Sequence, residues 1–380
     1  MSKPTPRQYF ADELRGFALL GIVLVNAPFL GISGQGFTEA SVASWADRAV
    51  ALLVVALAQA KFYLLFAFLF GYSMRFMVRD EQPQSLVRFR RRLFVLSGFG
   101  ALHAALMFFG DILLLYAVLG CALLVIHRWS DAALVRLTAA SGLLWLVLMG
   151  LLLLSSVESS EERVFAAQLA SFDAALTQGS FQQASLARLT FWPWAFISNS
   201  VLNGLPVLAM FALGLLAARK ELLAKPEGFE RFWAMGRWWG SWLGLPLACC
   251  SAWLQVGPGA QVGTNGGRET LGLVLGFVSA PLLSWGYVAW LLLWRTKWPG
   301  AVAWFRPAGR MSLSGYLGES LLLSLVFCAY GLGLYGQLGA AAVAGIAILV
   351  WLVLELMAHW AQRFTTRGPF ELVMRRLTGA

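Results

Sequence analysis

Charge is scarce in this sequence. Asp, Glu, Lys and Arg make up 13% of its 380 residues, whereas 59% are hydrophobic, and the mean hydropathy is +0.69. This excludes a soluble multi-domain enzyme, because such proteins contain about 25% charged residues. Cysteine and histidine are also scarce, with four Cys and three His. They show neither disulfide nor zinc-site spacing, so we expect no structural disulfide and no metal.

The sequence contains long hydrophobic runs. A helix that crosses a hydrocarbon core about 30 Å thick needs about 20 consecutive apolar residues. We predict ten such spans, at residues 14–33, 49–74, 93–109, 111–127, 133–155, 197–217, 237–256, 270–294, 311–333 and 339–360. The expected fold class is therefore all-α, a polytopic transmembrane helix bundle.

The positions of the basic residues orient the predicted spans. With a cytoplasmic N-terminus, all but five of the 29 Lys and Arg residues lie in cytoplasmic segments or at their borders. The exceptions are Arg48, Lys61, Arg163, Arg188 and Arg268. The positive-inside rule then predicts that both termini are cytoplasmic. The net charge of +10 is explained by this topology, so we expect membrane lipids as partners and no nucleic acid.

One long hydrophilic interruption, residues 156–196, divides the predicted spans into two halves, 1–155 and 197–380. It lies on the predicted outer side. Apolar residues recur within it at intervals of three and four positions: Phe165, Leu169, Phe172 and Leu176. This periodicity predicts an amphipathic helix on the outer surface or over a cavity, and a simple connector is the alternative.

Strongly polar side chains inside spans are costly and often functional. In the first span, Arg15 and Asn26 are eleven residues apart, so they share a helix face about 16 Å apart. Arg92 and His103 repeat this spacing in the third span, and Arg91 and Arg92 close the run "RFRRR". Guanidinium groups bind phosphates, while a neutral His accepts protons and an Asn amide donates to an oxyanion. The alternative is structural: arginines at helix ends and an Asn bonded between helices.

Other polar residues extend this pattern. Asp111 follows His103 at a tight hairpin, where its carboxylate would fix the imidazole tautomer, and Tyr116 is a further donor within reach. Lys61 lies near the middle of its predicted span and needs an anionic partner, which Asp111 or Glu319 would supply. A structural ion pair and a site for a substrate carboxylate both remain open for Lys61.

Several segments resemble the YeiB family of bacterial inner-membrane proteins. They are "DELRGFALLGIVLVN", "KFYLLFAFLFGYSM", "RRLFVLSGFGALHAALMFFGDILLLYAVLG" and "GRMSLSGYLGESLLLSLVFCAYGLGLYGQLG", with the closing "RGPFELVMRRLT". The resemblance covers nearly the whole chain. It implies a multi-pass protein of the bacterial inner (plasma) membrane.

The opening segment also resembles the first helix of transmembrane acyltransferases, namely the acyltransferase-three family and heparan-alpha-glucosaminide N-acetyltransferase. These proteins have an "LRG" start and a polar residue eleven positions after the Arg, here Asn26. The resemblance implies acetyl-CoA or another acyl-CoA as a cytoplasmic donor and an acceptor on the outer side. The first outer loop lacks the histidine of the heparan enzyme, so His103 would have to take that role.

These observations lead to one main hypothesis, a transmembrane acyltransferase that moves an acetyl or short acyl group to a hydroxyl or amine. Its acceptor would be a small molecule, a lipid or a glycan. The predicted residues are, by role, catalytic His103, Asp111 and Asn26, donor-binding Arg15, Arg91 and Arg92, and substrate-binding Lys61, Tyr116 and Glu319.

Two alternatives remain open at this point. The chain would be a transporter or exporter of a small anionic or amphiphilic solute, with Lys61 binding the anion and Asp111 and Glu319 carrying protons. It would otherwise be a lipid-binding or partner-binding scaffold. Glycine-rich segments such as "GYLGES" permit close helix packing, either within one chain or in a homodimer.

Overall fold

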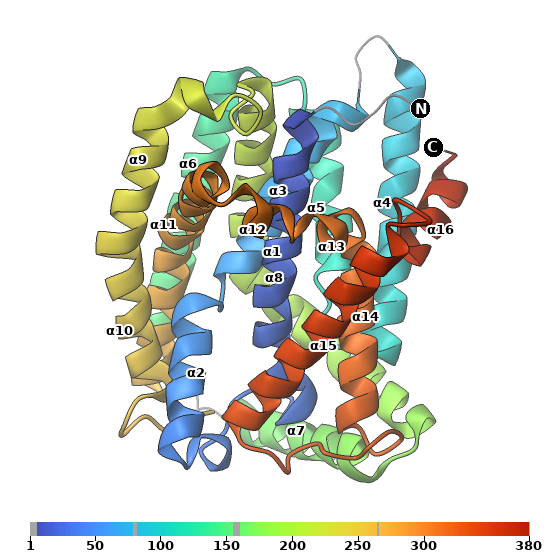
Figure 1. Cartoon of the computed structure of the whole chain (residues 1–380). Helices are drawn as coiled ribbons and strands as arrows, with labels where there is room; N and C mark the ends of the chain where they lie inside the picture. Colours follow the sequence, from blue (N-terminus) through green and yellow to red (C-terminus); the bar gives the residue numbers. More distant parts are fainter. Residues whose placement is uncertain (1–5, 79–81, 155–159, 264–265, 380) are drawn as a thin grey trace.

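The computed structural model describes residues 6–78, 82–154, 160–263 and 266–379, and these ranges contain helices and loops without a strand (Figure 1). The helices are α1 (Pro6–Gly31), α2 (Trp45–Leu57), α3 (Lys61–Met77), α4 (Pro83–Leu106), α5 (Leu113–Ile126), α6 (Asp131–Leu154), α7 (Ser160–Gln178), α8 (Phe181–Arg219), α9 (Glu230–Trp239), α10 (Leu245–Val256), α11 (Gly267–Lys297), α12 (Pro299–Ala303), α13 (Arg306–Arg310), α14 (Ser312–Phe327), α15 (Ala340–Ala361) and α16 (Pro369–Thr378). Short helical turns lie at Ala40–Val42, Pro226–Phe229 and Gly240–Gly244.

Six helical stretches of the described chain are long and apolar enough to cross a membrane. They are Tyr9–Gly31, Trp45–Met77, Asp131–Leu154, Phe181–Arg219, Gly267–Lys297 and Ala340–Ala361. The chain is therefore an all-helical membrane protein. The other predicted spans fall on α4, α5, α9 with α10, and α14, which are shorter, more polar or interrupted.

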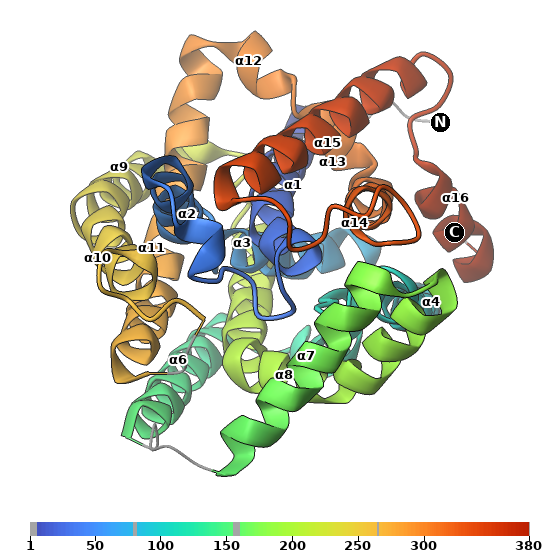
Figure 2. The same cartoon turned by 90° about the horizontal axis from the view of Figure 1, so that it is seen from below.

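Helix α1 runs through the middle of the bundle, where it contacts α3, α13, α14 and α15 (Figures 1 and 2). It begins at the end of the bundle where α15 ends, and α7 lies across the opposite end. The first is called the arginine end below, because Arg15, Arg92 and Arg306 lie there, and the second is called the α7 end. The polar groups described below lie in two regions, one near each end.

Glycines permit the close approach of helices α3 and α8. A Cβ on Gly71 of α3 would lie 2.2 Å from the carbonyl oxygen of Phe211, and one on Gly214 of α8 would lie 2.0 Å from that of Phe68. The two helices therefore cross backbone to backbone. Between helices in lipid there is little hydrophobic driving force, so small residues that permit such van der Waals contact favour packing.

The predicted span 49–74 is not one continuous helix, which corrects the sequence expectation. The chain breaks between α2 and α3, and Ala60 has a left-handed backbone with φ of 67°. Two side chains of α11 support the break, because Tyr287 donates to the Leu57 carbonyl at 2.7 Å and Ser284 donates to the Lys61 carbonyl at 2.9 Å. These bonds satisfy backbone groups that water cannot reach inside a membrane.

The predicted amphipathic helix is present as α7, with Leu169, Phe172 and Leu176 buried against the bundle. Helix α8 begins at Phe181 with a capping box between Ser180 and Gln183, and it continues for 39 residues. Residues 181–196 thus belong to a long helix, although Pro193 interrupts their sequence.

The C-terminal helix α16 closes part of the arginine end. The Glu371 carboxylate accepts hydrogen bonds from the backbone N–H groups of Leu313 and Ser314, at 2.8 and 3.1 Å, and from the Ser314 hydroxyl at 2.5 Å. These are unpaired donors of the first turn of α14, and a negative group is favourable at this end of a helix. Phe370 packs edge-on against Phe99 of α4.

Candidate functional site

Glu13, in the N-terminal part of α1, links segments that are distant in sequence. Glu13 is 1% exposed and is bound by two arginines from the other half of the chain. Arg306 donates to Oε1 through both Nε, at 3.1 Å, and Nη2, while Arg295 lies 3.0 Å from Oε2. Glu13 therefore fixes the start of α1 against α11 and α13.

Asp12 and Arg15 form a second group at the same end. Arg15 donates to Asp12 at 2.7 Å and to the Ser73 hydroxyl of α3 at 2.5 Å. Arg310 approaches the other oxygen of Asp12 at 3.6 Å. The Arg15 side chain remains 23% exposed, so its guanidinium is oriented by the protein and still accessible.

Arg92 of α4 lies near Arg15 of α1 at the arginine end. Its guanidinium interacts electrostatically with Arg15 and with the Glu371 carboxylate, and its Nε is buried without a hydrogen-bond partner. Arg91, next in sequence, lies on the exposed side of α4. The accessible guanidinium of Arg15 and the buried, unused Nε donor of Arg92 together form a favourable place for an anion.

The predicted pair of His103 and Asp111 is formed at the far end of α4. His103 Nδ1 lies 2.8 Å from Asp111 Oδ2, and both side chains are 0% exposed. Asp111 Oδ1 accepts from the Leu114 backbone N–H at 2.8 Å, at the start of α5. An ionised carboxylate only accepts, so Nδ1 carries a proton, and in a neutral imidazole the lone pair is then on Nε2. Nε2 is buried without a hydrogen-bond partner.

Tyr316 joins this pair, although the sequence analysis did not single it out. Its ring lies 4.8 Å from the His103 ring, centroid to centroid. Its hydroxyl is near the Ile112 backbone but falls short of hydrogen-bond geometry. Glu319 follows one turn later on α14, 3% exposed, with both carboxyl oxygens unpaired. A single tyrosine inside a spanning helix gives no sequence signal of function, because aromatic residues are also common in helix packing.

Helices α1 and α14 run side by side in parallel. Gly315 packs against Leu19, and Gly31 packs against Phe327, so both pairs differ by 296 in residue number. This register places Val23 level with Glu319 and Asn26 about one turn beyond. The Asn26 side chain is partly exposed and makes no hydrogen bond to any described residue. Asn26 is thus free to serve a ligand, and no direct bond links it to His103.

Lys61 does not pair with Asp111 or Glu319 in the described part of the chain, which corrects that expectation. Its ammonium group is 0% exposed and donates to the Val55 carbonyl at 3.2 Å. The helix break explains this, because the end of α2 presents carbonyl oxygens to the first residue of α3. Tyr116 likewise uses its hydroxyl on a backbone group, the Tyr63 carbonyl.

Arg188 is a buried residue whose role the sequence analysis missed. It is 1% exposed on α8 and donates to the Leu106 carbonyl at 3.1 Å, the Cys328 sulfur at 3.2 Å and the Tyr330 hydroxyl at 3.1 Å. Leu106 ends the helix that carries His103, so Arg188 supports the hairpin of the site. The sequence contained one signal for this role, because Arg188 is one of the five basic residues outside the predicted cytoplasmic segments.

The α7 end is fastened by one carboxylate. Asp173 of α7 accepts from the Ser33 hydroxyl at 2.7 Å, the Gly34 N–H at 2.8 Å and the Tyr335 hydroxyl at 2.7 Å. Burial and the neighbouring Asp173 carboxylate raise the pKa of the Tyr335 phenol well above its usual range, so it remains a donor. Helix α7 is thereby held over the end of α1. Among the described residues, no group of three or more His, Cys, Asp or Glu is placed to hold a metal.

Comparisons with known proteins cover nearly all of this chain. Residues 217–380 match the family described as "Protein of unknown function (DUF418)". The chain is 31% identical to the uncharacterized protein YxaH of Bacillus subtilis (strain 168) over 405 residues, which cover 97% of this chain and 93% of that protein. It is 26% identical to the uncharacterized protein YeiB of Escherichia coli (strain K12) over 409 residues, or 98% and 96% of the two chains.

A third relative matches a shorter region. It is an uncharacterized 39.9 kDa protein in the amylase 3′ region of Bacillus acidopullulyticus, 32% identical over 120 residues, which cover 31% of this chain and 33% of that protein. No solved structure matches the chain significantly.

Proposed function

The chain belongs to the YeiB-like family of membrane proteins, and we propose that it is a transmembrane acyltransferase. It would move an acetyl or other short acyl group from coenzyme A to a hydroxyl or amine. The observation that carries the proposal is the fully buried pair of His103 and Asp111, whose Nε2 is unpaired. A histidine held in this tautomer is suited to act as a general base.

The proposed topology has ten crossings with both termini in the cytoplasm of a bacterium, in its inner membrane. The crossings are α1, α2 with α3, α4, α5, α6, α8, α9 with α10, α11, α14 and α15. The arginine end would face the cytoplasm by the positive-inside rule, and the α7 end would face outward.

Arg15 and Arg92 would hold the phosphates of the acyl-CoA donor. The buried, unpaired Nε of Arg92 near Arg15 supports this assignment, whereas Arg91 is exposed on α4 and is not assigned to the donor. Arg92 and His103 are separated by about 16 Å along a helix. The long pantetheine arm of coenzyme A separates its thioester from its phosphates, so phosphates at the arginine end are compatible with a thioester near His103.

The reaction would use the groups in a fixed order. The acceptor hydroxyl or amine donates its proton to His103 Nε2 while its oxygen or nitrogen attacks the thioester carbon. Asp111 stabilises the imidazolium that forms, and the amide of Asn26 donates to the oxyanion. The carbon–sulfur bond then breaks, and the proton on His103 passes to the departing thiolate.

Donor binding provides the first test. Acetyl-CoA and free coenzyme A should raise the thermal unfolding temperature of the purified protein in detergent. A concentration of 100 times Kd would stabilise it by about 2.7 kcal/mol. Arg15→Ala and Arg92→Ala should each lose this shift relative to their own ligand-free samples, while Arg91→Ala, the matched neighbour, should retain it. Absence of a shift at millimolar ligand, or an equal loss in Arg91→Ala, would refute the donor site.

The break between α2 and α3 favours a second candidate function, transport of a small anionic or amphiphilic solute. Broken helices with buried charged groups are frequent at transporter binding sites, and Lys61 is buried at this break. A transporter would move solute across sealed vesicles and respond to collapse of the proton gradient. Acyl transfer should show no such dependence, so the same vesicles distinguish the two functions.

A further inference from the structure

Among the buried polar atoms without a hydrogen-bond partner, several belong to His103 and to the neighbouring turn of α14. They are Nε2 of His103, the hydroxyl of Tyr316 and both carboxyl oxygens of Glu319. Nearly all buried polar groups in proteins have a hydrogen-bond partner, because leaving one unpaired costs about 1–3 kcal/mol. Several such atoms in one place therefore indicate a site that a polar ligand completes.

Geometry places these groups together. The Tyr316 ring lies 4.8 Å from the His103 ring, and Tyr316 and Glu319 are three residues apart on one buried face of α14. Residues at this spacing are neighbours on a helix. The register of α1 and α14 sets Val23 opposite Glu319, with Asn26 about one turn further.

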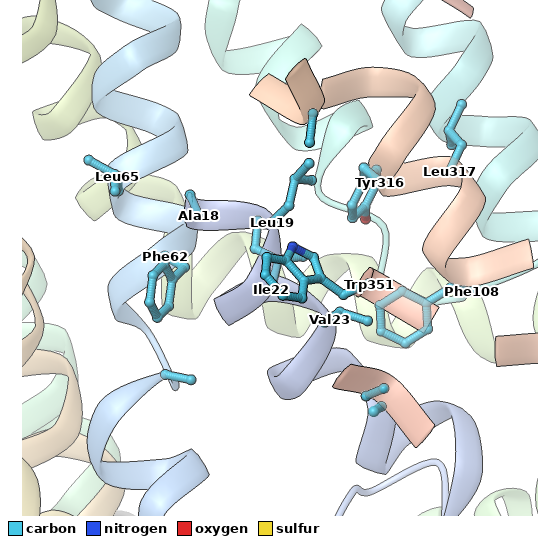
Figure 3. Close-up of a cluster of buried hydrophobic side chains, with 14 of the residues drawn as sticks. Ala18, Leu19, Ile22, Val23, Phe62, Leu65, Phe108, Tyr316, Leu317 and Trp351 are labelled. Carbon is cyan, nitrogen blue, oxygen red and sulfur yellow. The ribbon is translucent and has the colours of Figure 1, made fainter. Parts of the chain in front are cut away.

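The surroundings of the group are apolar. Figure 3 shows Tyr316 directed toward a cluster that includes Leu19, Ile22, Val23, Phe108 and Trp351. Such walls exclude water and strengthen any hydrogen bond formed inside them. A ligand here would be held by few polar contacts in a largely apolar site, which is typical of small-molecule binding sites.

The free atoms are mainly hydrogen-bond acceptors. Nε2 of His103 offers a lone pair, and the Glu319 carboxyl has no cationic partner among the described residues. The buried guanidinium of Arg188 cannot serve Glu319, because it donates to Leu106, Cys328 and Tyr330. The ligand that complements this group carries several N–H or O–H donors and a positive charge.

We propose that His103, Tyr316 and Glu319 form the acceptor site and that the acceptor is a primary amine. This rests on the proposed acyltransferase activity and narrows its acceptor from hydroxyl or amine to amine. Glu319 binds the ammonium form, because the pairing gives its buried carboxylate a counter-charge. The Tyr316 hydroxyl and His103 Nε2 orient the nitrogen.

The chemistry balances with these groups. One ammonium proton passes to Glu319, and the neutral nitrogen attacks the thioester carbon. A second proton moves from nitrogen to His103 Nε2 as the carbon–nitrogen bond forms. The carbon–sulfur bond breaks, and His103 returns that proton to the coenzyme A thiolate. The products are an amide, coenzyme A as its thiol, and one proton that leaves from Glu319.

The test uses the full-length protein in detergent, with ethanolamine as the probe. Ethylene glycol replaces its amine by a hydroxyl, and choline keeps the positive charge but has no N–H. At one fixed pH, ethanolamine should raise the unfolding temperature by roughly 2 °C, whereas the two control compounds should not. Glu319→Gln should abolish the shift. This variant should still fold, because Glu319 makes no polar contact with a described residue.

Tyr316→Phe should weaken the ethanolamine shift without removing it. Equal shifts from all three compounds, a full shift in Glu319→Gln, or no ethanolamine shift in the wild type would each overturn the amine site. Stabilisation by acetyl-CoA, measured in the same samples, separates the two proposals. If acetyl-CoA raises the unfolding temperature and ethanolamine does not, only the amine site is refuted. If acetyl-CoA gives no shift, the acyltransferase on which the inference rests is refuted.

Discussion

Replacing Glu13 by glutamine is expected to destabilise the protein by about 3 kcal/mol. The Glu13 carboxylate is 1% exposed, and each of its oxygens faces a different arginine, Arg306 or Arg295. Glutamine retains one oxygen and therefore one arginine, while its N–H₂ faces the guanidinium of the other. A hydrogen bond to a charged group contributes about 1.5–3 kcal/mol, and the lost neutralisation adds to that.

The exposure of the two arginines limits the effect. Their side chains are 27% and 30% exposed, so each is able to turn toward water once the carboxylate is lost. This is why we expect about 3 kcal/mol and not the upper end of about 5 kcal/mol measured for broken buried pairs.

Thermal unfolding of the purified protein measures this effect, and the chain offers a matched control. Asp131 also binds two cations, Arg219 at 3.0 Å and Lys220 at 2.8 Å, but its side chain is 41% exposed. Asp131→Asn should therefore cost at most about 1 kcal/mol. We expect Glu13→Gln to lower the unfolding temperature by roughly 5 °C. Equal shifts in the two variants would refute the claim that burial sets the strength of the Glu13 tie.

Two further variants test the site and the packing. Asp111 accepts from two donors, the Leu114 backbone N–H and His103 Nδ1, whereas Asn has only one acceptor oxygen. If that oxygen keeps the Leu114 N–H, the amide N–H₂ faces His103 Nδ1. The His103 proton then moves to Nε2. Acyl transfer should fall about 10³–10⁴-fold with acetyl-CoA binding unchanged, and retained activity in a coenzyme A release assay would contradict the general-base role. Gly71→Ala would place Cβ 2.2 Å from the Phe211 carbonyl oxygen and should cost about 3 kcal/mol. Gly142→Ala, which meets nothing within 4 Å, should be neutral or stabilising by about 0.5–1 kcal/mol, and equal unfolding temperatures would refute the close crossing.

Local patterns carried the correct structural predictions. The three- and four-residue periodicity of Leu169, Phe172 and Leu176 predicts α7, because one turn of helix is enough to define an apolar face. The contact between His103 and Asp111 follows from a hairpin too short to separate them. In both cases the interacting residues lie within a few positions of one another.

The expected ion pair of Lys61 with Asp111 or Glu319 is wrong because the position of Lys61 depends on contacts between segments distant in sequence. Its partner is a backbone carbonyl that becomes available only where α2 ends, and that break depends on Ser284 and Tyr287, more than 200 residues away in sequence. Hydropathy is averaged over a window, so a break of three residues inside a long apolar run still scores as one continuous span. No periodicity could therefore have assigned Lys61 its partner.

By itself, the sequence determined that this protein is a helical membrane protein, because hydropathy sums over a whole segment and does not depend on which helix is its neighbour. It also placed Arg15, Asn26, Arg92 and His103 on the faces of their helices, since helical geometry is local. Only the tertiary structure decided that Arg15 meets Arg92 and that Tyr316 of α14 covers His103. Those contacts depend on the order and register in which helices pack, and in lipid that register is set by glycine contacts and shape across distant segments.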